Sequence, residues 1–231
     1  MAERDHALLE SEDALLQSAS PLANGLGVTD TPLQQLIRQW QNERYAPEIL
    51  AGHEAALNVL LDHIRRQSDT IQHLRNDPGS SEDEHFRIML AQTEIERVKF
   101  VVRSYIRTRL HKIEQHARLI VDTPGLQGRL SQTELNHAQR RFAKLTETYF
   151  HMSVLQALPE DQRGLDDDAA FVPPMIPEPN RSHSVFVHAR EDCPPVPLPD
   201  SNFLTMRKGL IVLTPYSVIE PLLADGSIEL V

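Results

Sequence analysis

Apolar residues recur between residues 81 and 123 at steps of three, four or seven, which is the pattern of one buried stripe on an α-helix. No proline or glycine interrupts Ser81 to Thr123, so the pattern predicts a single helix about 60 Å long. A second apolar set lies off this stripe and indicates that the helix also packs against another element: Met89, Phe100, Val101 and Tyr105. The stripe itself consists of Ile88, Ile95, Val98, Val102, Ile106, Leu110, Ile113, Ala117 and Ile120.

Start and stop signals bound the helices on either side. Thr31 and Pro32 open the first helix as N-cap and first helical residue. The second helix follows Pro47, as its start or as the elbow before it, and ends at residues 77–79, which read Asp-Pro-Gly. Ser80 or Ser81 caps the long helix, and Asp-Thr-Pro-Gly at 122–125 ends it.

A fourth helix begins with a capping box, in which Ser131 is followed three residues later by Glu134. The apolar residues behind it step 3-4-3-4-3, which is typical of a bundle face, and Pro159 closes the helix: Leu135, Ala138, Phe142, Leu145, Tyr149 and Met152. Residues 29–158 are therefore predicted to form an all-helical domain of about four helices.

The composition changes after this point. Eight of the 16 prolines lie between Pro173 and Pro199, which excludes long helices and predicts a Pro/Asp-rich linker over residues 159–182. Short strand patterns follow at 185–190, 203–206, 210–213 and 228–231, with a short helix after Pro215. Residues 183–231 thus form a small β-rich domain that needs a neighbour to bury enough surface. With a disordered acidic tail predicted over residues 1–28, the fold class is α+β.

Charge and composition narrow the function. The formal net charge is −10, with 33 acidic and 23 basic residues, which argues against unaided binding to DNA or RNA. The single cysteine, Cys193, excludes an internal disulfide and a cysteine-based zinc site. No apolar run reaches the roughly 20 residues that a membrane span requires, so we expect no membrane association.

Residues that could carry chemistry do not form a recognisable site. Asp-Thr-Pro-Gly at 122–125 matches the Asp-x-x-Gly switch of GTPases, but the phosphate-binding Gly-x-x-x-x-Gly-Lys loop is absent from the sequence. The 11 histidines include no pair four residues apart that would place two imidazoles on one helix face. No nucleophile has a credible base. We therefore predict no catalytic residues, no cofactor and no metal, and a protein that is not an enzyme.

One concentration of basic residues lies on the long helix: Arg97, Lys99, Arg103, Arg107, Arg109 and Lys112. These side chains could form a groove for phosphate or for an acidic partner helix. The favoured alternative is that they pair with glutamates that neighbour them along the helix.

Four segments in collinear order resemble the GINS subunits of the eukaryotic replicative helicase, in particular the Sld-five ("Go") type. They are WQNERYAPEIL at 40–50, the stretch from Glu96 and Arg97 to SYIRTRLHKIE at 104–114, LSQTEL at 130–135 with Tyr149, and IEPLLADGSIELV at 219–231. The resemblance covers roughly residues 30–231. Residues 1–28 and the proline loop at 191–199 do not match.

The resemblance implies a helical A domain followed by a small β-rich B domain, which agrees with the order found above. It also implies a nuclear, non-catalytic subunit of a heterotetramer with three paralogous GINS subunits. In that family the complex joins the MCM motor and its Cdc-type co-activator to form the active helicase in replication initiation and elongation. Contacts with the replicative polymerase, and with a fork adaptor through the N-terminal tail, are further expectations, and DNA is contacted only indirectly.

Eight residues are predicted to form the interface with partner subunits: Tyr105, Arg109, Lys112, Phe142, Tyr149, Ile228, Leu230 and Val231. Each of them could instead belong to the internal core. Two other classes of function stay open from the sequence, a small helical hydrolase or nucleotide-binding enzyme and a stand-alone homo-oligomeric helical adaptor.

Overall fold

The computed structural model describes residues 30–76, 81–160, 177–198 and 203–231. The predicted tail, residues 1–28, lies outside these ranges, as do residues 161–176 of the predicted linker. Helices come first and a small sheet follows, which confirms the α+β class. Two compact units are present, one of described residues up to Trp40 with His53–Ile106, the other of Gln41–Gly52 with Arg107–Val231. The predicted domain limits stay a prediction.

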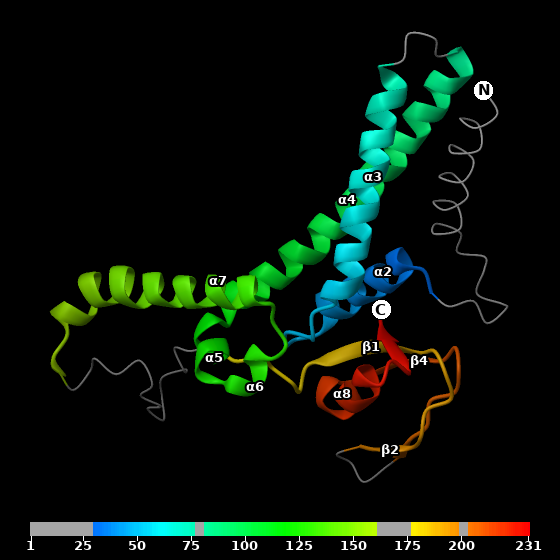
Figure 1. Ribbon diagram of the computed structural model, residues 1–231. Coiled ribbons are helices and arrows are strands. Elements are labelled where there is room, and N and C mark those ends of the chain that lie inside the picture. The colour runs from blue at the N-terminus through cyan, green and yellow to red at the C-terminus, as the bar shows by residue number, and fades with distance from the viewer. Residues whose placement is uncertain (1–29, 77–80, 161–176, 199–202) are drawn as a thin grey trace. The chain divides into compact units, whose positions relative to one another are not determined.

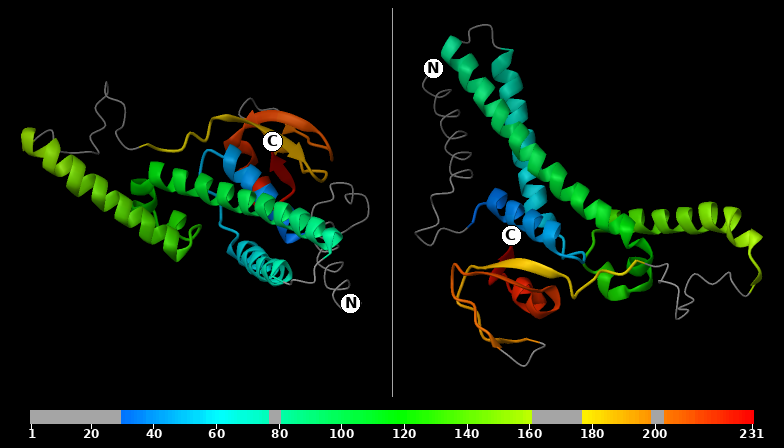
Figure 2. Two further views of the ribbon diagram at one scale, coloured as in Figure 1. Left: turned by 90° about the horizontal axis from the view of Figure 1, so that it is seen from above. Right: turned by 180° about the vertical axis from the view of Figure 1, so that it is seen from behind.

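The first unit packs three helices around one core. Helix α3 (Glu54–Arg75) and helix α4 (Glu82–Gln115) lie side by side and run in opposite directions (Figures 1 and 2). The beginning of α2 (Pro32–Tyr45) joins them. Burying each large aliphatic side chain in such a core contributes about 1.5–3 kcal/mol. The buried residues are Leu33, Leu36, Leu60, Ile64, Ile95, Val98, Val102 and Tyr105.

The predicted starts of the first helix and of the long helix are confirmed, and α3 begins seven residues after Pro47, which is therefore an elbow before the helix. Thr31 Oγ1 accepts a hydrogen bond from the Gln34 N–H at 3.3 Å, and the Gln34 side chain accepts one from the Thr31 N–H at 3.0 Å. Ser81 and Glu84 make the same reciprocal pair at the start of α4. Three acidic residues follow in the first turn of α4, where the helix dipole favours negative charge.

The predicted stripe on α4 is confirmed from Ile88 to Val102, but it is wrong at Ile106, which is 37% exposed. Between Val102 and Ile113 the buried face continues through Tyr105, Arg109 and Lys112, and Ile113 is again fully buried, as the stripe predicts. A hydrophobic pattern cannot follow this part of the face, because two of its three buried residues, Arg109 and Lys112, are charged.

The prediction of one helix to Thr123 is also wrong. Helix α4 ends at Gln115, and α5 (Ala117–Asp122) begins after a break at His116, whose backbone has φ −110° and ψ 26°. The His116 ring nitrogen Nδ1 lies 2.9 Å from the carbonyl oxygen of Pro177. The new direction places Ile120 in a fully buried cluster with Ala138, so tertiary contacts stabilise a break that has no sequence signal.

Helix α6 (Pro124–Gln127) and helix α7 (Gln132–Ala143) follow α5 in the second unit. The predicted capping box is confirmed at the start of α7, between Ser131 and Glu134. Beyond Ala143 the chain continues as a π-helix, η2 (Lys144–His151), and then a 3₁₀ turn, η3 (Leu155–Ala157). The predicted bundle face is buried at Ala138 but exposed at Leu145, Tyr149 and Met152, so the second half of this face has no cover within the described chain.

The C-terminal module contains the predicted strands and the short helix α8 (Tyr216–Ala224). Strands β4 (Ile211–Pro215), β1 (Ser184–Ala189) and β5 (Ile228–Leu230) form an antiparallel sheet in the order β4-β1-β5. The register places Val187 opposite Val212 on one side and Leu230 on the other. Strands β2 (Val196–Pro197) and β3 (Phe203–Leu204) pair separately.

The C-terminal module packs against another segment of the chain, as its small size predicts. Its core includes Ala46, and Leu50 packs against it, although both residues lie far away in the sequence. The rest of this core comes from the sheet and α8, with Val187, Tyr216 and Ile219 fully buried. The segment Gln41–Gly52 is therefore part of the folding unit of the sheet.

The turn before β5 gives a test of the backbone geometry. Gly226 has φ +76°, and a Cβ there would meet no atom within 4 Å. Gly226→Ala should therefore lower the free energy of unfolding by about 1 kcal/mol through backbone strain alone. Urea unfolding followed by circular dichroism measures this. The control is Gly125→Ala, where the space is also open and the backbone is ordinary; equal effects of the two substitutions would contradict the prediction.

Candidate subunit interface

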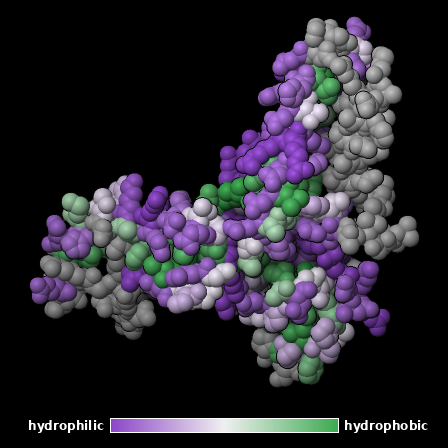
Figure 3. Space-filling model, in the orientation of Figure 1, coloured by the Kyte–Doolittle hydropathy of each residue, from purple (hydrophilic) through white to green (hydrophobic). Residues whose placement is uncertain are grey.

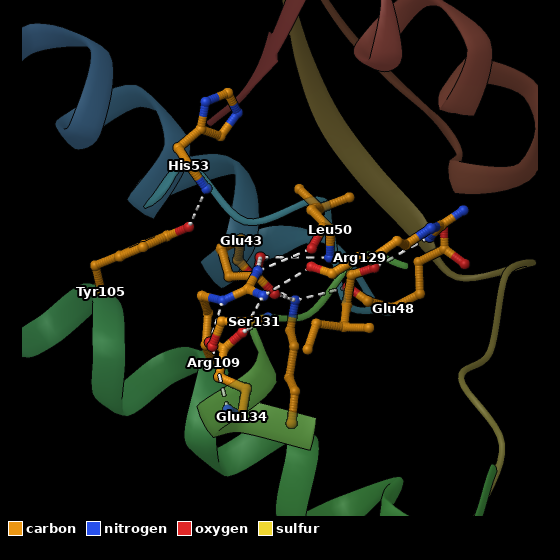
Figure 4. Close-up of polar contacts among 11 residues, drawn as sticks. Glu43, Glu48, Leu50, His53, Tyr105, Arg109, Arg129, Ser131 and Glu134 are labelled. Atoms are coloured by element: carbon orange, nitrogen blue, oxygen red, sulfur yellow. Dashed lines mark hydrogen bonds and ion pairs between the residues drawn. The ribbon is translucent and has the colours of Figure 1, made fainter. Parts of the chain in front are cut away.

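Arg109 lies at the centre of a buried polar cluster in the second unit (Figure 4) and is 2% exposed. Its Nε and Nη2 donate to the two carboxylate oxygens of Glu134 at 2.8 and 3.0 Å. Its Nη1 donates to Glu43 Oε2 at 3.0 Å and to the Leu50 carbonyl at 2.8 Å. A further bond from Nη2 reaches the Arg129 carbonyl at 3.1 Å. The planar guanidinium thus joins α4 to α2, α7 and two loops.

Glu43 lies between two cations and is 1% exposed. Lys112 Nζ donates to Glu43 Oε1 at 3.0 Å, to the backbone carbonyl of Glu43, and to the Glu48 carbonyl at 2.8 Å. Burial lowers the pKa of Lys112, and the charge of Glu43 opposes this shift without cancelling it. One carboxylate from α2 therefore fixes two adjacent turns of α4.

Glu48 organises a second group of polar contacts. Its carboxylate accepts hydrogen bonds from the Tyr216 hydroxyl at 3.0 Å and from Arg181 Nη2 at 2.8 Å, and pairs with Arg129 Nη1 at 3.1 Å. Burial alone would raise the pKa of Glu48, but the bond and charge of Arg129 outweigh it and the net shift is downward. Burial, and then the charge of Glu48, raise the pKa of Tyr216, which therefore donates as a neutral phenol.

Asn42 completes the connection to the sheet. Its Oδ1 accepts a hydrogen bond from the backbone N–H of Leu230 in β5 at 2.8 Å. Together with Glu43 and Glu48, it makes the segment Gln41–Gly52 the common partner of α4, α8 and β5. We call this set of contacts the Arg109 cluster: Asn42, Glu43, Glu48, Arg109, Lys112, Arg129, Glu134 and Tyr216.

Five of the eight predicted interface residues are buried by this chain itself: Tyr105, Arg109, Lys112, Ile228 and Leu230. The Tyr105 hydroxyl accepts a hydrogen bond from the His53 N–H at 3.3 Å, and its ring lies in the core of the first unit. For these five the structure shows the internal position that the sequence left open. Their contact with a partner subunit stays a prediction.

The other three candidates keep accessible surface. Tyr149 is 57% exposed and Val231 is 50% exposed. Phe142 is half-buried, with the Arg118 guanidinium 5.9 Å from its ring centroid. An interface role for these residues also stays a prediction.

The acidic half of the Arg109 cluster was not predicted from the sequence. Glu134 was identified only as a capping residue, and the structure gives the same carboxylate a second role as the bidentate partner of Arg109. Asn42, Glu43 and Glu48 lie within the segment WQNERYAPEIL, which carries the family resemblance. No pattern in the sequence signals that these polar side chains are buried.

Three of the basic residues earlier on α4 behave as the simpler hypothesis predicts. Arg97 pairs with Glu94 at 2.9 Å, and Glu96 pairs with Lys99 at 2.9 Å and with Arg103 at 3.4 Å. These pairs are exposed and contribute little stability. The hypothesis does not hold for Arg109 and Lys112, whose partner Glu43 comes from another helix.

The described residues also bear on other kinds of site. In the part of the chain that the structure describes, no three His, Cys, Asp or Glu side chains are placed to bind a metal ion together. None of the described helices combines the length and apolar character needed to cross a bilayer. A cavity of about 440 Å³ beside α5 is lined by Leu119, Leu126 and the ion-paired side chains of Glu48, Arg129 and Arg181, and those pairs fix its walls.

Comparisons with known proteins match both parts of the chain. Residues 63–154 match the family model described as the GINS complex protein helical bundle domain. Residues 179–231 match the model described as the DNA replication complex GINS protein SLD5 C-terminus.

Similar full-length proteins come from fungi and animals. The DNA replication complex GINS protein sld5 of Schizosaccharomyces pombe is 31% identical over 223 residues, which cover 96% of this chain and 99% of that protein. SLD5 of Chaetomium globosum is also 31% identical and covers 95% of this chain and 99% of its own length. Human SLD5 is 27% identical, with coverage of 86% and 88%.

Removing the guanidinium should show how much the second unit depends on it. Arg109→Met leaves Glu43 buried beside a single cation and Glu134 without its bidentate partner, so we expect a loss of about 3–5 kcal/mol in the free energy of unfolding. Arg97→Met is the matched control on the same helix, because its side chain is 74% exposed and its loss should cost under about 0.5 kcal/mol. Equal urea midpoints for the two variants would refute the role assigned to Arg109.

Acid should weaken the same cluster. Burial opposes ionisation of Glu134, but the bonds and charge of Arg109 outweigh it and lower the pKa of this carboxyl from its ordinary value of 4.5. A lowered folded-state pKa means that the unfolded chain binds protons first, so stability is fully present above about pH 5 and falls as pH decreases through 4.5. Urea midpoints measured between about pH 7 and pH 3 test this. Glu134→Gln should flatten part of the decline, and an unchanged pH profile in this variant would contradict the assignment.

Proposed function

Because the chain belongs to the SLD5 family of GINS proteins, we propose that it is a non-catalytic structural subunit of a GINS complex in DNA replication. In this proposal it assembles with three paralogous subunits into a heterotetramer in the nucleus. The complex then joins the MCM motor and its Cdc-type co-activator to form the active helicase. The Arg109 cluster supports the chain's own fold, and partner subunits cover the apolar surfaces that the fold leaves exposed.

The observation that carries this proposal is an apolar surface on the last helical segment. We define the α7–η2 surface by Leu145, Tyr149, Met152 and Val154, which are between 39% and 66% exposed. Figure 3 shows hydrophobic residues over this segment between hydrophilic neighbours. Leu145, Tyr149 and Met152 continue the 3-4 spacing of Ala138 and Phe142, which is the spacing of a packed helix face. Contiguous exposed apolar surface of this kind marks protein–protein contacts.

A second exposed surface supports the same proposal. The outer side of α4 carries Phe86, Met89 and Leu90, which are between 50% and 65% exposed. These positions lie opposite the buried stripe of Ile88, Ile95 and Val98 on the same helix. A helix with apolar residues on both sides needs a partner on each, and in the first unit α3 and α2 cover one side.

Charge favours protein partners over direct contact with DNA. The formal net charge is −10, and the exposed basic residues Arg97, Lys99 and Arg103 on α4 are already paired with glutamates. Binding to the phosphate backbone depends on unpaired clusters of Lys and Arg. DNA is therefore reached through other subunits of the assembly. Contacts of the replicative polymerase and a fork adaptor with residues 1–28 remain predictions for a segment outside the described residues.

The α7–η2 surface can be tested by charge. The double variant Tyr149→Asp and Met152→Asp should reduce co-purification with the three paralogous subunits at least tenfold, because it places carboxylates in an apolar contact. Both side chains are more than half exposed, so the chain's own helicity and urea midpoint should not change. Circular dichroism and pull-down after co-expression measure the two effects.

The control is Gln139→Asp, which adds negative charge at an exposed polar position of α7. It should leave co-purification intact. A double variant that co-purifies as well as the control would contradict the proposed interface. A wild-type chain that is monodisperse alone and does not bind the other subunits would contradict the proposed function as a whole.

A further inference from the structure

The two edges of the three-stranded sheet differ in how far their outward backbone groups are hydrogen-bonded by the rest of the described chain. On the β5 edge, the Leu230 N–H points away from β1 and donates to Asn42 Oδ1 at 2.8 Å. Natural sheets cover or charge their edges because an open edge can pair with another strand. The β5 edge is therefore partly closed by the chain itself.

The β4 edge has no such cover among the described residues. The Ala189 N–H donates to the Leu210 carbonyl at 3.0 Å, and the Tyr216 N–H donates to the His183 carbonyl at 3.0 Å. These two bonds bracket the β1–β4 ladder, and antiparallel bonding alternates along a strand. The backbone groups of Val212 and Thr214 therefore face β1, whereas those of Ile211 and Leu213 face outward. No backbone hydrogen bond in the described ranges joins β4 to a strand other than β1.

The side chains at this edge are apolar and accessible. Ile211 and Leu213 are 57% and 56% exposed, and Phe186, which lies opposite Leu213 on β1, is 55% exposed. All three point to the face of the sheet away from its core, since they alternate with buried Val185, Val187 and Thr214. No charged residue lies between Leu210 and Pro215 to protect the edge.

We propose that the β4 edge binds an extended peptide of a partner protein, which adds to the sheet as a fourth strand. Only an extended chain can satisfy the outward N–H and C=O groups of two alternate residues, because a helix uses its own backbone groups internally. An apolar side chain of that peptide would lie beside Leu213 on the same face of the sheet. Pro215 has no N–H, so the pairing ends there.

The charged side chains next to the β4 edge indicate which charge the bound peptide should carry. Arg207 and Lys208 are exposed in the turn that precedes β4. Asp192 lies in the same region, where its carboxylate accepts the backbone N–H of Lys208 at 2.9 Å. Glu191 is exposed next to Asp192, and Arg190 precedes both, so three basic side chains stand against two carboxylates and an acidic residue at the matching end of the peptide is favoured. The fitting partner is thus an extended peptide with alternating apolar residues and an acidic end.

The test uses the full chain and a synthetic probe, an acetylated hexapeptide with the sequence Asp-Val-Thr-Val-Thr-Val. Titration followed by backbone amide NMR should shift the Ile211 and Leu213 signals, while those of Val212 and Thr214 change little. The same peptide N-methylated at alternate residues should bind at least tenfold more weakly, because it cannot donate along one side. Equal binding of the two peptides, or no binding of either at about 1 mM, would overturn the proposal.

Variants of the protein distinguish a partner peptide from a different occupant of the β4 edge. Leu213→Pro removes one outward N–H and should weaken the probe at least tenfold, whereas Arg207→Glu with Lys208→Glu should weaken it several-fold and favour a probe that begins with Lys. If Leu213→Pro loses β-structure by circular dichroism, the comparison of the unmodified and N-methylated peptides on the wild-type chain still tests the proposal.

Dimers that dissociate in Leu213→Pro would identify a second copy as the occupant. Probe binding only after residues 1–28 are deleted would identify the chain's own N-terminal segment, and either result would overturn the proposal. Co-purification with the paralogous subunits through the α7–η2 surface is a separate measurement.

Discussion

The second unit depends on the ionic contact between Arg109 and Glu43, both almost completely buried. An isolated charge in this position would cost several kcal/mol, and the structure offsets that cost by giving the guanidinium acceptors from Glu134, Leu50 and Arg129 as well. The geometry is specific because the guanidinium binds the Glu134 carboxylate in one plane through two parallel bonds, which directs Nη1 toward Glu43 Oε2 and the Leu50 carbonyl. The contact therefore fixes both the position of Gln41–Gly52 and its orientation.

That segment in turn explains how a small sheet is stabilised. A module of this size buries too little surface to be stable alone, and Gln41–Gly52 supplies what it lacks. Ala46 and Leu50 extend the apolar core. Glu48 accepts a hydrogen bond from the Tyr216 hydroxyl, and Asn42 accepts one from the outward-facing Leu230 N–H of β5. The sheet and α4 both contact the segment Gln41–Gly52, the sheet through Asn42 and α4 through Glu43. The stability of the C-terminal module is therefore linked to that of α4. Mutations on either side of this link are expected to be non-additive.

Much of this fold could be predicted from local signals, because caps and turns depend on a few adjacent residues. Ser131 with Glu134, Thr31 with Pro32, and the glycines of the two tight turns at 209 and 226 are of this kind. The break at His116, the buried charge of Arg109 and the change from α to π-helix after Ala143 could not be predicted. The first two depend on contacts with residues distant in the sequence, Pro177 for His116 and Glu43 for Arg109.

Two tyrosines show what a hydrophobic pattern can and cannot state about function. Tyr105 lies off the stripe predicted for α4, yet the chain buries it. Tyr149 lies on the most regular face in the sequence, yet it is 57% exposed. The pattern identifies residues that favour burial, but it carries no information on which polypeptide covers them. Only the fold of the single chain separates the apolar residues that it buries itself, such as Tyr105, from those that it leaves exposed, such as Tyr149. An apolar position that keeps helix-face spacing and remains exposed, as Tyr149 and Met152 do, is therefore stronger evidence for a partner than either the spacing or the exposure alone.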